Sequence, residues 1–283
     1  MKLNSISTLA ALTFAAGSLF TTSVQAQIVI NASAWYDASD ASTITTVTGG
    51  NVTNWNDKSG NGVNLVQATD GDRPSLVTGS PTTGINGLNV LEFAGRTEDM
   101  DAISNIDATW AAVVLQYNGT PGFATALGSQ TQAGGATYTI QYRGDQTTTP
   151  TGDRWQAAYS TNGNPASTSG AAAILNSPGV VINSGFALTN FDLQIGGDRG
   201  LNNRGWDGYI AEVIYGNETL TVGEQDAVEG YLAHKWGFEA SLVDGHAYKD
   251  FAPTDFTIVP EPSSFALLAG CFGLTWVMLR RRR

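Results

Sequence analysis

Residues 208–215 read Gly-Tyr-Ile-Ala-Glu-Val-Ile-Tyr, and this run sets the fold class. Alternate residues from Tyr209 to Tyr215 are apolar and would share one face of a β-strand, because side chains of a strand alternate between its two faces. The same period of two recurs in residues 110–117, where Val113, Leu115 and Tyr117 alternate with partners on the other face. The pattern predicts strands of a sheet with a buried face.

A helix signal follows this run. Residues 221–237 read Thr-Val-Gly-Glu-Gln-Asp-Ala-Val-Glu-Gly-Tyr-Leu-Ala-His-Lys-Trp-Gly. Thr221 and Glu224 have the spacing of a capping box, in which the first residue caps the helix and the second bonds back to it. Apolar residues then recur at helical spacing as far as Trp236, and Gly237 suits a C-cap. We expect one short α-helix near the C-terminus, lying across the edge or back of the sheet.

The rest of the body consists of short apolar or alternating runs separated by Gly, Asn, Asp, Ser and Thr. Strands at such short spacing, joined by turn-forming residues, predict an all-β, two-sheet antiparallel sandwich. Further candidate strands are residues 28–36, 87–93, 136–142, 154–159, 179–182 and 191–195.

The C-terminal end reads as a processing segment. A Pro-Glu-Pro box is followed by fifteen mostly apolar residues from Phe265 to Leu279. As a helix they would span roughly 22 Å, less than the roughly 30 Å hydrocarbon core of a membrane. Cationic residues after such a segment favour the cytoplasmic side. The pattern resembles the PEP-CTERM sorting tail, which an exosortase-type membrane protease removes; a retained tail anchor is the alternative. The residues that carry the resemblance are Val259, Pro260, Glu261, Pro262, Arg280, Arg281, Arg282 and Arg283.

The N-terminal end has the pattern of a secretory signal peptide. Lys2 precedes an apolar stretch, and small or apolar residues stand one and three positions before a cut between Ala26 and Gln27. We therefore predict a signal helix and a C-terminal transmembrane sorting helix flanking the body. The predicted boundaries are 1–26 for the signal peptide, 27–240 for the domain, 241–259 for a polar linker and 260–283 for the sorting signal.

Charge and cysteine content restrict the function. Removing Lys2 and the four terminal arginines leaves 9 of 14 basic residues, and removing Glu261 leaves 24 of 25 acidic ones, so the body carries about −15. Such a charge disfavours nucleic acid and anionic membranes as partners and is compatible with cation binding. The single cysteine, Cys271, lies in the tail, so the body has no disulfide. A domain of this length can bury enough surface to fold without one.

Five blocks carry a second resemblance, and they span most of the body. They look like the LamG-like jelly-roll domains of the concanavalin A-like superfamily. The resemblance implies a two-sheet jelly roll that binds glycans or proteins, often with calcium at a loop rim, while some relatives are glycanases. Function varies widely on this fold. The blocks are residues 34–40, 52–62, 85–93, 208–213 and 228–237.

A glycanase would need two carboxyl groups about 5–5.5 Å apart, which alternate residues of a strand provide. Glu224, Asp226 and Glu229 match a Glu-x-Asp-x-x-Glu pattern of endoglucanases on this fold. Here the hexapeptide falls on the first turns of the predicted helix, where its acids diverge around the axis. We read it as a false match and predict no enzyme. Of the two histidines, His234 is expected against the sheet and His246 in solvent.

Calcium is a possible cofactor, because hard cations bind carboxylate and loop carbonyl oxygens. Asp198 and Asp207 bracket a Gly- and Asn-rich loop, and Asp70 with Asp72 offers a second one. Ordinary turns use the same residues. The acidic run at residues 98–101 is expected to decorate a loop.

Glycan binding would use aromatic faces beside planar polar side chains. Trp155, Tyr142 and Trp206, with Arg204, are the candidate ligand-binding residues, although a core position is favoured for both tryptophans. We therefore expect an exported, non-catalytic surface or matrix protein that binds polysaccharide or a surface protein. A glycoside hydrolase or lyase of the same superfamily and a purely structural matrix protein are the alternatives.

Overall fold

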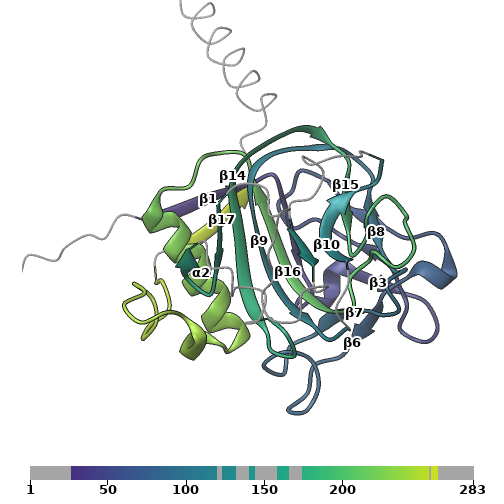
Figure 1. Ribbon diagram of the computed structural model, residues 1–283, viewed down its shortest axis with the longest axis horizontal. Helices are drawn as coiled ribbons and strands as arrows, with labels where there is room; N and C mark the ends of the chain where they lie inside the picture. Colours follow the sequence, from purple (N-terminus) through teal and green to yellow (C-terminus); the bar gives the residue numbers. More distant parts are fainter. Residues whose placement is uncertain are drawn as a thin grey trace, which may run out of the picture.

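The computed structural model describes residues 27–119, 123–131, 140–143, 158–165, 174–254 and 256–260. Within these ranges it contains two antiparallel sheets and one α-helix, which confirms the predicted β-sandwich (Figure 1). The predicted signal peptide, Trp155 and all residues after Pro260 lie outside the described residues. In the part of the chain described, no helix is long and apolar enough to cross a membrane.

The larger sheet has eight strands, and its long strands β14, β9 and β16 are hydrogen-bonded to one another. In spatial order they are β13 (Asn164–Pro165), β12 (Ala158–Thr161), β14 (Gly179–Phe191), β9 (Ile106–Tyr117), β16 (Gly208–Gly216), β7 (Val90–Phe93) and β6 (Ser75–Val77), and β2 (Ala34–Asp37) also pairs with β16.

The smaller sheet has seven short strands. In spatial order they are β11 (Ile140–Arg143), β10 (Phe123–Ser129), β15 (Leu193–Ile195), β8 (Met100–Ala102), β5 (Leu65–Val66), β4 (Val52–Trp55) and β3 (Ile44–Thr46). Three 3₁₀ turns, η1 (Ala41–Thr43), η2 (Asp70–Asp72) and η3 (Glu239–Ser241), complete the described secondary structure together with α2, β1 and β17.

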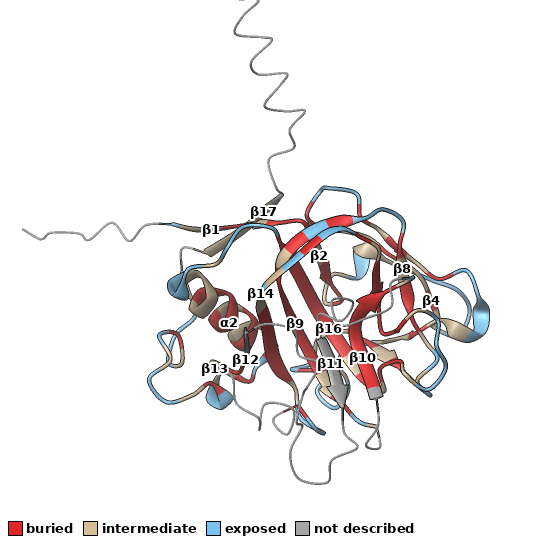
Figure 2. Ribbon diagram, turned by 45° about the horizontal axis from the view of Figure 1, so that its top comes forward, coloured by how far each residue is buried: buried red, intermediate tan, exposed pale blue. Residues whose placement is uncertain are grey.

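The larger sheet is buried on both faces. Residues 111, 113, 115 and 117 of β9 enter the core between the two sheets, whereas residues 110, 112 and 114 enter a second core beneath the helix. The buried central strands are visible in Figure 2. This is why residues 110–117 are apolar at nearly every position even though the sheet is antiparallel.

The helix α2 (Val222–Trp236) covers the second core. Thr221 and Glu224 form the predicted capping box, and Gly237 ends the helix with a φ of 73°, which favours glycine. Val228, Leu232 and other apolar residues of the helix pack against β9, β14 and β16. The helix and its two caps are confirmed.

Because the cap is a local interaction, Thr221→Ala should lower the free energy of unfolding by about 1 kcal/mol. Urea unfolding followed by circular dichroism measures this loss. Thr219→Ala makes the same chemical change at an exposed position two residues earlier. An equal loss in both variants would contradict the capping role.

Residues 241–259 were predicted to be a linker, and that prediction is wrong. Strand β17 (Phe256–Pro260) pairs in parallel with β1 (Ile28–Ala32), and Gln27 Nε2 donates to Thr257 Oγ1 at 3.1 Å. Leu242 is buried, and Phe256 and Ile258 pack against the second core. The domain therefore extends to Pro260, and it includes Val259 and Pro260 of the predicted sorting motif.

Strand β16 departs from the predicted alternation. Its register with β9 shifts between Ile210 and Glu212, which indicates a β-bulge. Tyr209 and Ala211 consequently face the helix side, whereas Val213 and Tyr215 face the core between the sheets. The bulge also turns Glu212 toward α2, where its carboxylate meets the helix side chains.

Candidate functional site

Carboxyl groups gather on the outer face of the seven-stranded sheet. Met100 and Ala102 of β8 enter the core between the sheets, so the alternate residues Asp99 and Asp101 lie on the opposite face. Asp99 N–H donates to Asp72 O at 3.0 Å, and Asp72 lies close enough for its charge to add to the effect of burial in raising the pKa values of both Glu98 and Asp99. We call Asp72, Glu98, Asp99 and Asp101 the acidic cluster.

Two glutamines line the acidic cluster. Gln194, which lies opposite Asp101 on β15, donates from Nε2 to Asp101 Oδ1 at 2.9 Å. Gln67 donates from its side chain to Asp99 O at 3.2 Å and also to the Asp99 carboxylate. The Oε1 atom of Gln194 is buried and has no hydrogen-bond partner in the described structure. A Cβ at Gly197 would lie 2.7 Å from both this atom and Asp99 Cβ, so only glycine fits there.

Burial keeps these carboxyl groups from ionising easily. Burial, together with the nearby charges of Glu92, Asp207 and Asp72, raises the pKa of Glu98 to about 7. Burial and the charge of Asp101 raise the pKa of Asp99 to about 7. The pKa of Asp101 is also raised, first by burial. None of the ion pairs in the described residues includes these three groups. The carboxyl groups of Glu98 and Asp99 therefore exchange protons near neutral pH.

These shifts predict how stability depends on pH. The carboxyl groups of Glu98 and Asp99 titrate at about pH 4 when unfolded, so the folded chain binds more protons between about pH 4 and about pH 7. Their stabilising contribution is complete below about pH 4 and is lost as the pH rises through about 7. Urea unfolding should show a smaller loss of stability between about pH 5 and about pH 8 in Asp99→Asn than in wild type. An unchanged pH dependence would argue against the shift at Asp99.

The sequence interpretation missed the acidic cluster, because it placed residues 98–101 in a loop with no functional role. A usable signal was present: apolar Met100 stands between Asp99 and Asp101, which is the alternation of a strand with one polar face. Burial of the two acids depends on Gln67 and Gln194, which are distant in sequence. Sequence periodicity could not predict that part.

The predicted aromatic platform is wrong at Trp206. Its side chain is fully buried, and its ring meets Tyr117 edge-on with centroids 5.1 Å apart. The indole N–H lies 3.3 Å from both Gln116 O and Tyr209 O. Tyr142 lies opposite Ala124 in β11, and Trp155 is outside the described residues. Trp206 is thus a core residue, the position that its sequence favoured.

The two residues predicted to bind calcium, Asp198 and Asp207, lie in different environments. Asp198 is buried and accepts from Arg199 Nε at 2.8 Å and from Arg204 Nη1 at 3.3 Å. The predicted ligand-binding residue Arg204 therefore neutralises a buried acid. Asp207 instead lies near the acidic cluster, where its charge raises the pKa of Glu98 after the larger effect of burial. Calcium at Asp198 and Asp207 stays a prediction.

The Glu-x-Asp-x-x-Glu hexapeptide lies on the first turns of α2, as predicted. Glu224 bonds to its cap, while Glu229 is buried and accepts from His246 Nε2 at 3.1 Å. The expectation that His246 faces solvent is wrong, because its side chain is only 2% exposed. Tyr248 N–H donates to His246 Nδ1 at 3.2 Å, which places the proton of a neutral ring on Nε2. Asp226, Glu229 and His246 lie close enough to hold a metal, but this tautomer leaves Nε2 no lone pair for one.

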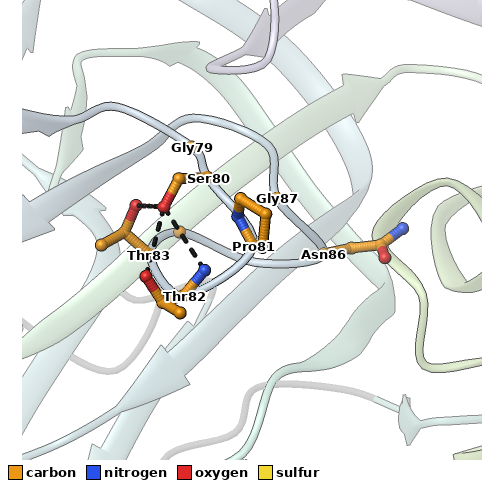
Figure 3. Close-up of a pocket in the computed structure, with 8 residues that line it drawn as sticks. Gly79, Ser80, Pro81, Thr82, Thr83, Asn86 and Gly87 are labelled. Carbon is orange, nitrogen blue, oxygen red and sulfur yellow. Dashed lines mark hydrogen bonds between the residues drawn. The ribbon is translucent and has the colours of Figure 1, made fainter.

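A surface hollow of about 730 Å³ lies elsewhere, over the loop at residues 79–87 (Figure 3). Ser80 Oγ bonds to Thr82 N and Thr83 Oγ1 within the loop, at 3.3 and 2.7 Å. The lining contains no charged or aromatic side chain. It offers hydroxyl and backbone groups and the amide of Asn86, and we assign it no chemistry.

No protein-family model, curated protein or solved structure that we compared with the chain matches it. The resemblances to LamG-like domains and to the PEP-CTERM tail therefore stay predictions.

Proposed function

We propose that the chain is an exported, non-catalytic binding module that takes a hydroxyl-rich glycan at the acidic cluster. The observation that carries the proposal is the placement of Asp101 in β8 and of Asp99 directly before it on one outer face, with no cationic partner among the residues that the structure describes. Half-buried carboxyl groups with raised pKa values are costly to keep, and such groups concentrate at functional sites.

The chemistry of the cluster suits sugar hydroxyl groups. A hydroxyl both donates and accepts a hydrogen bond, and a carboxyl group that shares protons near neutral pH can do the same. Gln194 donates from Nε2 to Asp101 and so fixes the orientation of that carboxyl group. Planar amides and carboxyl groups therefore present the hydrogen-bonding partners that a polyol needs.

The export part of the proposal comes from the two ends. The signal-peptide pattern ends at Ala26, and the first described strand begins at Ile28. The Pro-Glu-Pro box and the terminal arginines support sorting by an exosortase-type protease to the cell surface or extracellular matrix. We propose a jelly-roll arrangement for the sandwich on the same resemblance that suggests glycan or protein ligands.

Retention on immobilised polysaccharides tests the site. Asp99→Asn combined with Asp101→Asn should weaken retention roughly tenfold or more, because hydrogen bonds to charged groups contribute about 1.5–3 kcal/mol. Asp244→Asn is the control, since it makes one such change at a fully exposed side chain. Equal retention of the wild type, the double variant and the control would show that the ligand binds outside the acidic cluster. No retention of wild type, with assembly that increases with concentration, would favour a purely structural matrix protein.

Glycoside hydrolysis is the second candidate function, and the same pair of acids favours it. Asp99, with its pKa of about 7, would be the acid, and Asp101 two residues later would be the base or nucleophile. Release of reducing ends from soluble β-glucans, abolished by either single Asn substitution in a folded protein, would replace the binding proposal with this one.

A further inference from the structure

A buried polar network joins β2, β16 and α2. The Glu212 side chain is fully buried, and its carboxylate oxygens take hydrogen bonds from four groups. Lys235 Nζ and Trp236 Nε1 reach Oε2, each at 2.7 Å, and Trp35 Nε1 and Tyr231 OH reach Oε1 at 2.9 and 3.1 Å. The donors come from the two ends of the domain.

Asp37 lies beside Glu212 as its register partner in the neighbouring strand. Lys235 Nζ lies 2.8 Å from Asp37 Oδ2 while it also contacts Glu212, so one amine bridges two carboxyl groups. The other oxygen, Asp37 Oδ1, accepts from Ser39 N at 3.0 Å and from Ser39 Oγ at 2.6 Å. The Asp37 and Glu212 side chains are 5% and 0% exposed, which keeps water away from the pair.

We propose that Lys235 Nζ and Asp37 Cγ form an amide bond within the folded chain, with Glu212 as the group that moves the protons. The reaction needs no oxidant or other reactant. The N–Cγ bond forms and the Cγ–Oδ2 bond breaks. Of the three hydrogens on the ammonium, one remains on the amide nitrogen and two leave with Oδ2 as water.

The surrounding groups suit the proton transfers and hold the carboxyl group in place. Burial raises the pKa of Glu212, against the opposing charge of Lys235, so Glu212 takes up a proton more readily than an exposed carboxylate. It can therefore accept a proton from the ammonium and return it to the leaving oxygen. Ser39 holds Oδ1, which carries the negative charge of the tetrahedral intermediate and remains as the amide oxygen.

Lys58 has a different role in the proposed reaction. Its Nζ lies 2.9 Å from Asp37 Oδ2 and 3.0 Å from Asp40 Oδ2, but its ion pairs in the described residues do not include Glu212. Lys58 therefore lacks the proton acceptor that Lys235 has. Its positive charge balances the carboxyl groups and assists departure of Oδ2.

Because the amine of Lys235 and the carboxyl group of Asp37 are held in contact, the reaction gains the large rate advantage of an intramolecular step.

The bond would tie the second strand of the domain to its helix. A covalent link that closes most of the chain restricts the unfolded state, as a disulfide does. The body has no cysteine with which to form a disulfide.

Tryptic digestion of the purified full chain after denaturation tests the proposal. Mass spectrometry should find the peptide containing Asp37 joined to the peptide containing Lys235, lighter by one water than the two together. Trypsin should fail to cut after Lys235, because an acylated lysine carries no charge. Two separate peptides and normal cleavage after Lys235 in the wild type would overturn the proposal, and so would a link at Lys58.

Variants then assign the roles. Lys235→Arg keeps the charge and should lack the link. Glu212→Gln keeps the shape of the side chain, and loss of the proton acceptor should slow the bond by about a hundredfold or more. Lys249→Arg is the matched control, because Lys249 pairs with the exposed Asp244 outside the network, and this variant should keep the link. A link that forms equally fast in Glu212→Gln would overturn the role of Glu212. The wild-type digest decides the main point even where a variant does not fold.

Discussion

Glu212→Ala is expected to lower the free energy of unfolding by about 3–5 kcal/mol, the loss that follows when one partner of a buried ion pair is removed. The substitution leaves Lys235, Trp236 Nε1 and Trp35 Nε1 without the acceptor that they share. Unsatisfied buried donors each carry a desolvation cost. The loss is large because the carboxylate serves four donors, three from α2 and one from β2.

Equilibrium unfolding in urea, followed by tryptophan fluorescence, measures this loss. Glu218→Ala is the matched control, because Glu218 is exposed and its hydrogen bond to Asn31 lies in solvent. Its effect should stay within about 0.5 kcal/mol. A loss below about 1 kcal/mol in Glu212→Ala would mean that the network rearranges around water.

Trp206→Ala should cost about 3–5 kcal/mol, the usual range for removing a fully buried tryptophan from a core. The indole fills space between the sheets against Tyr117, so its loss leaves a cavity and frees two carbonyl acceptors. A ligand platform would behave differently: its truncation would weaken binding and leave stability unchanged.

The thermal midpoint and the urea midpoint of Trp206→Ala both report on this cost. Phe251→Ala is the comparison, because Phe251 is 59% exposed and its truncation should change stability by less than about 0.5 kcal/mol. Should the two variants be equally stable, the buried position of Trp206 would be in doubt.

Local signals predicted the local structure well. The capping box at Thr221 and the glycine at residue 237 depend only on neighbouring residues, and both ends of α2 are where these residues indicate. The strands β9 and β16 follow from their apolar residues in the same way. Such signals work because backbone caps and side-chain alternation are set within a few residues.

The errors arise where distant residues decide. The bulge in β16 cannot be read from its own residues, because it depends on the register with β9. His246 was expected in solvent because its neighbours in the sequence are polar. In the fold its side chain is buried and contacts Glu229 on α2. Trp206 was favoured for the core from its sequence but was also kept as a ligand-binding candidate, and its contacts with Tyr117 and Tyr209 decide between the two. Burial is a property of the assembled fold, and one sequence reports it poorly.

The pairing of β1 with β17 affects how the domain bears mechanical load. The two strands run in parallel, with Ile28 opposite Phe256 and Ala32 opposite Pro260. Opposite pulls on the start of β1 and the end of β17 would therefore load the ladder in shear. Its hydrogen bonds would have to break together, whereas a peeled hairpin breaks them one at a time. Force spectroscopy on molecules held at residues 27 and 260 should record one resistant event before the sandwich extends, and a gradual low-force rise would contradict it.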